Sequence, residues 1–170
     1  MENKMKKIRI EKVTLNIGIG ESGERLTKAT KLLTSISKAK AIQTKSMKRI
    51  PTWGVRPNLA IACKVTVRKE KAEELLGRLL NATKNILSES KFDNFGNFSF
   101  GIPEYIDISG VEYDPDVGII GLEVAVTLER PGFRIKNRIK KEKIPARHKI
   151  SKKEAMDFIQ SKYKTEIIGD

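Results

Sequence analysis

Period-2 alternation, with an apolar row opposite a row of polar or small residues, is clear along four stretches of the chain, and this pattern limits the possible folds more than any other feature. Successive side chains of a β-strand point to opposite faces of the sheet, so each stretch predicts a strand with one buried and one exposed face. Such strands form a sheet covered on one side only, whereas strands covered on both sides read as continuous apolar runs. The apolar rows are Val13, Leu15, Ile17 and Ile19; Leu59, Ile61, Cys63, Val65 and Val67; Phe98, Phe100 and Ile102; and Ile120, Leu122, Val124, Val126 and Leu128.

Two weaker signals complete the predicted sheet. A further strand is expected over residues 41–47, with Gln43 and Lys45 on one face. Ile8 and Ile10 are out of phase with the row that starts at Val13, and an extra residue in one strand shifts the phase in this way. The sequence therefore predicts a β-bulge near residues 11 and 12.

Three segments carry helical rather than strand spacing. The third opens with Ser151-Lys-Lys-Glu154, the pattern of a helix-capping box. The order strand-helix-strand-strand-helix-strand-strand-helix predicts one α+β domain over residues 1–170, with a single layer of about five strands, helices on one face and an open second face. The helical rows are Leu26, Ala29, Leu32, Leu33 and Ile36; Ala72, Leu75, Leu76, Leu79, Leu80, Ile86 and Leu87; and Ala155, Met156, Ile159 and Tyr163.

The charge of the chain is concentrated in two stretches. The 34 Lys and Arg residues outnumber the 21 Asp and Glu residues, which gives a net charge of +13. Residues 38–68 contain eight basic residues and no acid, and residues 134–153 contain ten basic residues and one acid. No acid within residues 38–68 neutralises their charge, so we expect a polyanionic partner, and nucleic acid is favoured because Lys and Arg neutralise phosphates. An anionic membrane surface is the alternative, but no stretch has the amphipathic composition of a membrane-surface helix.

The predicted open face and two projections collect the candidate contact residues. The open face is expected to carry Lys12, Thr14, Asn16, Gln43, Lys45, Lys64, Thr66 and Arg68. A loop at 46–58 and a basic arm at 131–150, which we expect to order on its partner, would add further contacts. Trp53 in the loop could stack on a base, or alternatively fold back into the core. The other candidates are Lys48, Arg49 and Arg56 in the loop, and Arg134, Lys136, Arg138, Lys140, Lys141 and Arg147 in the arm, where His148 is expected to contact phosphate or solvent.

Other readings of the sequence are weaker. Gly18-Ile-Gly20-Glu-Ser-Gly23 matches a dinucleotide-binding fingerprint, but no acid follows it between Glu24 and Glu70, where the ribose ligand should stand. Asp114-Pro-Asp116 lacks the spacing of a calcium loop. Cys63 lies in an apolar row, and one Cys with one His cannot form a structural zinc site. The sequence thus offers no catalytic residues, metal site or cofactor, and an enzyme acting on a nucleotide or on RNA remains only as an alternative.

The compartment is expected to be the cytoplasm. No apolar run approaches the roughly 18 residues that span a bilayer. The segment Met1 to Lys7 is basic but has no apolar stretch typical of a signal peptide, and the single cysteine excludes an internal disulfide.

Several strings together resemble one known family. They are Lys12-Val-Thr-Leu-Asn-Ile-Gly-Ile-Gly20, Cys63-Lys-Val-Thr-Val-Arg68, Phe98-Ser-Phe-Gly-Ile102, Tyr113-Asp114 and Gly121-Leu122. In this order and spacing they resemble the universal large-subunit ribosomal protein family number five, which carries 5S ribosomal RNA. The stretch from Arg130-Pro-Gly-Phe133 through Ile150 resembles the archaeal and eukaryotic branch, and we suspect the archaeal type.

The resemblance implies a concave antiparallel sheet that holds 5S RNA in the central protuberance of the large subunit. The residues that correspond to the family's RNA contacts are Lys12, Asn16, Gln43, Thr66, Arg68 and Asp114. It also implies contacts with large-subunit RNA and neighbouring proteins, a loop at 46–58 near the P-site transfer RNA, and a bridge to a small-subunit head protein. Off the ribosome we expect a monomer. A free-standing RNA-binding regulator with the same face remains an alternative.

Overall fold

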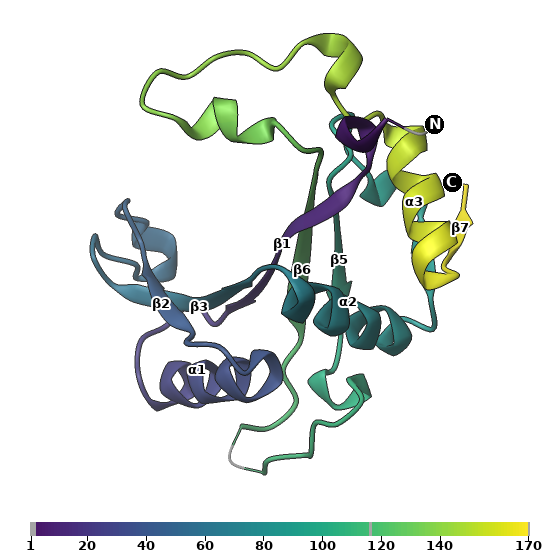
Figure 1. Ribbon diagram of the computed structural model, residues 1–170. Coiled ribbons are helices and arrows are strands. Elements are labelled where there is room, and N and C mark those ends of the chain that lie inside the picture. The colour runs from purple at the N-terminus through teal and green to yellow at the C-terminus, as the bar shows by residue number, and fades with distance from the viewer. Residues whose placement is uncertain (1–2, 116, 170) are drawn as a thin grey trace.

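A computed structural model describes residues 3–115 and 117–169, so Met1 and Asp116 lie outside the described residues (Figure 1). Five strands form one sheet in the order β2-β3-β1-β6-β5, and every neighbouring pair is antiparallel. The prediction of an open, five-stranded α+β fold is confirmed. The strands are β1 (Arg9–Gly18), β2 (Ile42–Lys45), β3 (Ala60–Val67), β5 (Phe98–Ile102) and β6 (Leu122–Glu129).

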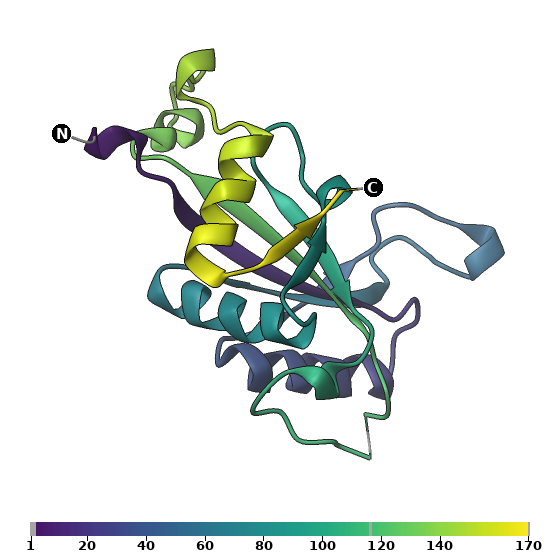
Figure 2. The same ribbon diagram turned by 90° about the vertical axis from the view of Figure 1, so that its right-hand side faces the viewer.

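Two helices cover one face of this sheet. α1 (Glu24–Ser37) packs against β3 and α2 (Glu70–Ala82) against β1, side by side below the strands in Figure 2. Their apolar stripes are buried together with the apolar rows of the strands in one hydrophobic core. Among the described residues, no α-helix covers the opposite face of the sheet (Figure 1). The one-sided cover follows directly from the alternating strand pattern.

The third helix and a second, small sheet lie beside α2. α3 (Lys152–Tyr163) begins with the predicted capping box, in which the side chains of Ser151 and Glu154 each accept a hydrogen bond from the other residue's backbone. At the other end of α3 the Tyr163 hydroxyl donates to the backbone oxygen of Glu73 in α2 at 3.2 Å. This contact fixes the C-terminal part of the chain to the helical layer.

The second predicted helix is shorter than its apolar pattern. α2 ends at Ala82, and Lys84 and Asn85 adopt left-handed backbone conformations that end a helix. Ile86 and Leu87, predicted as helical, instead lie in β4 (Ile86–Ser88), which pairs in parallel with β7 (Glu166–Ile168). The sequence analysis missed both short strands, because three residues are too few to show a period.

The predicted β-bulge is confirmed. The register between β1 and β6 shifts between Ile10, which pairs with Leu128, and Lys12, which pairs with Thr127. The antiparallel sheet also removes the structural context of the dinucleotide fingerprint, which needs a parallel strand-helix-strand unit. Within the described residues, no helix has the length and apolar character needed to cross a membrane.

Candidate nucleic-acid interface

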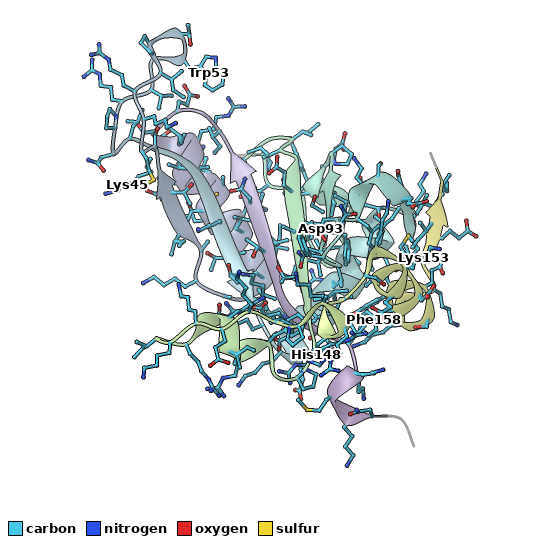
Figure 3. All side chains as sticks on the ribbon, turned by 90° about the horizontal axis from the view of Figure 1, so that it is seen from above. Lys45, Trp53, Asp93, His148, Lys153 and Phe158 are labelled. Carbon is cyan, nitrogen blue, oxygen red and sulfur yellow. The ribbon has the colours of Figure 1, made fainter. Side chains whose placement is uncertain are left out.

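The open face is organised by strand register into rows of side chains that cross the sheet. In an antiparallel pair, residues directly opposite each other point to the same face. One row runs from Lys64 on β3 through Asn16 on β1 to Glu123 on β6 and Gly101 on β5. The adjacent row consists of Thr66, Thr14, Ala125 and Ser99. Figure 3 shows this face from above, with the strands in front of α1.

The rows present hydrogen-bond donors and small side chains. The hydroxyls of Thr14 and Thr66 lie 3.4 Å apart. Asn16 donates through Nδ2 to Glu123 Oε2 at 3.2 Å, and Lys64 is exposed beside it. Lys12, Thr14, Asn16, Lys64 and Thr66 therefore lie together on one face, as predicted. Such a surface can offer cations to phosphates, and hydroxyl and amide groups to ribose and bases.

Two acids at the bulged end of the face are neutralised by cations. The side chain of Glu11 is only 14% exposed and lies 3.4 Å from Arg68 and 3.9 Å from Lys136. Arg9 makes a second pair with Glu129 at 2.7 Å. Arg68 thus lies beside the face where the sequence predicted it, but it is partly engaged by Glu11, whose burial against the bulge could not be read from the sequence.

The prediction that Gln43 shares the open face is wrong. Gln43 pairs with the buried Cys63, so its side chain belongs to the face covered by the helices. It remains exposed because β2 is the edge strand of the sheet. The register shifts between Thr44 and Lys45, and the shift pairs Lys45 with Ala60 on the open face, as predicted. The edge strand therefore contributes Lys45 but not Gln43 to this surface.

The loop 46–58 is a folded projection from the edge of the sheet (Figure 1). Ile50 and Val55 exchange two backbone hydrogen bonds of 2.9 and 3.1 Å across it, and Val55 is buried within the loop. Trp53 stands at its far end with 75% of its surface exposed (Figure 3), so the alternative that it folds into the core is wrong. The basic residues of the loop are all exposed: Lys48, Arg49 and Arg56.

The arm 131–150 projects along another side of the open face and is fixed at its base (Figure 1). Phe133 and Ile150 are buried in the core. His148 Nε2 lies 3.0 Å from the Pro131 oxygen, so it donates there and holds the base of the arm, while the residue stays half-buried. Lys136 stands over the Phe133 ring and faces Glu11. The remaining Lys and Arg residues of the arm are exposed: Arg134, Arg138, Lys140, Lys141, Lys143, Arg147 and Lys149.

Asp114 lies apart from this surface. Its backbone N–H donates to the Tyr105 hydroxyl at 3.0 Å, inside the segment that joins β5 to β6. That segment packs against the helical side, where Arg78 of α2 donates to the Ser109 oxygen at 3.0 Å. The structure thus separates Asp114 from the other candidate residues.

Sequence reasoning missed two residues of the interface. Glu123 and Lys91 both line a hollow on the open face next to Asn16. Glu123 belongs to the polar row of β6, so alternation contained the signal, but its pairing with Asn16 depends on the register of strands far apart in sequence. Lys91 lies in a short 3-10 turn that shows no periodic pattern. No cluster of residues that could bind a metal occurs in the described part of the chain.

The chain is similar in sequence to known ribosomal proteins over nearly its whole length. The family model "Ribosomal protein L5" matches residues 3–56, and the model for the C-terminus of the same ribosomal protein family matches residues 60–158. The chain is 50% identical to the large ribosomal subunit protein uL5 of Nanoarchaeum equitans, over 99% of this chain and 100% of that protein. It is 48% identical to that of Sulfurisphaera tokodaii, over 98% of this chain and 95% of that protein. The uL5 protein of Methanococcus maripaludis strain C7 is 44% identical, with 98% and 94% covered. Both family models and full-length archaeal relatives thus match, and the chain belongs to the ribosomal protein L5 family.

Proposed function

We propose that this chain is a non-catalytic constituent of the large ribosomal subunit in the cytoplasm, and that it binds 5S ribosomal RNA through the open face of its sheet. The observation that carries the proposal is the register of the face, which brings Lys64, Asn16, Thr14 and Thr66 into two adjacent rows. Family membership supports a ribosomal RNA as the partner.

The two projections extend the proposed interface. The loop 46–58 would contact the P-site transfer RNA, and the arm 131–150 would contact large-subunit RNA. Both segments stand away from the helical layer, on the side where the sheet is open (Figure 1), and their basic candidate residues other than Lys136 are exposed. Neighbouring proteins of the central protuberance and a small-subunit head protein are further proposed partners. As a single domain and a monomer off the ribosome, the chain would help to attach 5S RNA to the subunit.

A gel-shift assay with purified 5S RNA across a salt series tests the main proposal. The logarithm of the binding constant should fall by about 0.7 to 0.9 for each phosphate neutralised, per unit of log salt. The double variant Lys45→Gln, Lys64→Gln, which removes two exposed cations of the open face, should reduce this slope. Asn16→Ala should weaken binding with little change in slope, because its amide neutralises no phosphate. A binding constant that does not respond to salt would overturn the proposal.

A further inference from the structure

We infer that Asn16 and Glu123 form a nucleotide-reading site on the open face, in which the Glu123 carboxylate accepts hydrogen bonds from an unpaired guanine of the bound RNA. The inference rests on the proposed function and adds to it a residue that reads base identity. It begins with the shape of the surface around Glu123.

Glu123 stands between two adjoining hollows. One has a volume of about 480 Å³ and the other of about 440 Å³, and Asn16, Gly101 and Glu123 line both. Gly101 lies directly opposite Glu123 on β5, and a Cβ atom added there would meet no other atom within 4 Å. The hollow is thus open above the backbone of Gly101, and a flat ring could approach the strand closely.

The charge around Glu123 distinguishes it from the other acids of the face. Glu11 and Glu129 are each paired with cations, at 3.4 and 2.7 Å for the nearest partner. Within residues 3–115 and 117–169, Glu123 has no cation in ion-pair distance. An unneutralised carboxylate repels phosphate, so its presence in an RNA interface is unfavourable unless RNA donors bind to it.

The chemistry of the pair favours guanine. Asn16 Nδ2 donates to Glu123 Oε2, which orients the carboxylate and leaves acceptor positions on both oxygens. Guanine presents two adjacent N–H donors on its Watson–Crick edge, and two carboxylate oxygens match them, whereas adenine and cytosine present a single amino group. Unpaired bases in RNA are read on this edge. A ribose 2′-hydroxyl is the other donor of RNA that could bind here.

Cations lie on both sides of the Asn16–Glu123 pair. Lys64 is the neighbour of Asn16 on the side away from Glu123, and strands in a sheet are about 4.8 Å apart. Lys91 lines one hollow from the opposite side. The carboxylate is therefore flanked by cations that can bind phosphate, while it reads the base.

The direction of the effect of Glu123→Gln on 5S RNA affinity tests the inference. We expect about tenfold weaker binding with an unchanged salt slope, because a base contact of about 1.4 kcal/mol is lost. The matched control is Glu129→Gln, on the same strand and face but outside the hollow, which should bind unchanged or more tightly. If Glu123→Gln also binds 5S RNA with unchanged or higher affinity, the carboxylate makes no favourable contact with the RNA and the inference is wrong. If the wild-type protein does not bind 5S RNA, the proposed function itself fails.

A steric variant separates the reading site from a purely structural role. Gly101→Val would place a side chain in the hollow, where its Cβ atom meets no other atom within 4 Å. It should weaken 5S RNA binding while the thermal unfolding midpoint stays at the wild-type value. Full affinity for 5S RNA in this variant would contradict the inference.

Short oligonucleotides identify the donor. NMR titration would compare a uridine heptamer whose central nucleotide is guanosine, inosine or 2′-deoxyguanosine. We expect guanosine to bind more tightly than inosine, which lacks the amino group, and Glu123→Gln to abolish the difference. A preference for guanosine over 2′-deoxyguanosine that depends on Glu123 would assign the ribose hydroxyl instead. If Glu123 affects neither comparison, the inference is overturned.

Discussion

Arg130 Nη2 lies 2.7 Å from Glu154 Oε1, and this ion pair joins the end of β6 to the first turn of α3. The Arg130 side chain is 6% exposed. It also donates to the backbone oxygens of Lys6 and Lys149, at 3.1 and 3.0 Å. One guanidinium therefore holds the N-terminal segment, both ends of the basic arm and α3 in a fixed arrangement.

Arg130→Gln should destabilise the protein by about 2–3 kcal/mol, because Glu154 and two backbone oxygens in partly buried hydrogen bonds lose a charged donor. The measurement is the free energy of unfolding from urea titration. Arg9→Gln removes a pair of the same 2.7 Å length whose arginine is 54% exposed, and it should lose about 1 kcal/mol or less. Equal losses for the two variants would show that burial of Arg130 contributes nothing.

The pKa of Glu154 gives this junction a pH dependence. Hydrogen bonds from the Ser151 backbone, and the nearby Arg130 guanidinium, lower the pKa of Glu154 below its ordinary value of 4.5. A lowered folded pKa adds stability above the ordinary value, and this stability is lost as the pH falls through the folded pKa. The difference in unfolding free energy between the wild type and Glu154→Gln should therefore be constant near neutral pH and shrink in acid. A difference that grows in acid would contradict this assignment.

The contribution of Tyr163 to stability should have the opposite pH dependence and be lost in alkali. Burial, and then the charge of Glu73, raise the pKa of Tyr163 from 10.0 to about 12. A raised folded pKa means that its contribution to stability is complete below pH 10 and is lost as the pH rises towards 12. Ultraviolet difference spectra of the wild type against Tyr163→Phe should show one phenol that ionises late. Ionisation of that phenol near pH 10 in folded protein would show that it is solvated.

Cys63 should react with thiol reagents only when the protein unfolds. Its side chain is buried, and burial raises the pKa of the Cys63 thiol, so little reactive thiolate forms. Labelling rates should follow global unfolding across a urea series. Cys63→Ser should cost about 1–3 kcal/mol through a buried hydroxyl. Its 5S RNA affinity in the folded fraction should equal that of the wild type, and rapid labelling of native protein would contradict the buried position.

The tip of the loop 46–58 should contribute to transfer-RNA retention and not to 5S RNA binding. Trp53 is exposed and Val55 is buried within the loop instead of the main core, so deletion of residues 50–55 should leave the core intact. Ribosomes that carry the deletion should contain 5S RNA but retain less P-site transfer RNA in filter binding. Trp53→Ala should share this defect and Thr52→Ala, one residue away, should not. Loss of 5S RNA binding in a folded deletion variant would assign the loop to the primary face.

Much of the fold and part of the candidate interface could be predicted from the sequence, because they depend on local periodicity. The alternation around Leu15 and Val65 defines which side of each strand is apolar, and the phase change after Ile10 locates the bulge. The capping box at Ser151 and Glu154 predicts the start of α3 from four residues. These signals suffice to predict that the sheet is covered on one side only. They also suffice to predict the five central residues of its open face: Lys12, Thr14, Asn16, Lys64 and Thr66.

The tertiary structure decided the features that depend on contacts between distant segments. Pairing with Cys63 placed Gln43 on the helical face, and a register shift after Thr44 placed Lys45 on the open face. Short apolar runs such as Ile86 and Leu87 became strands only through pairing with β7. Likewise, nothing near Glu123 in the sequence shows that Asn16 lies opposite it. Periodicity determines the faces of a strand relative to its own axis, but register is determined by packing and hydrogen bonds with strands elsewhere in the chain.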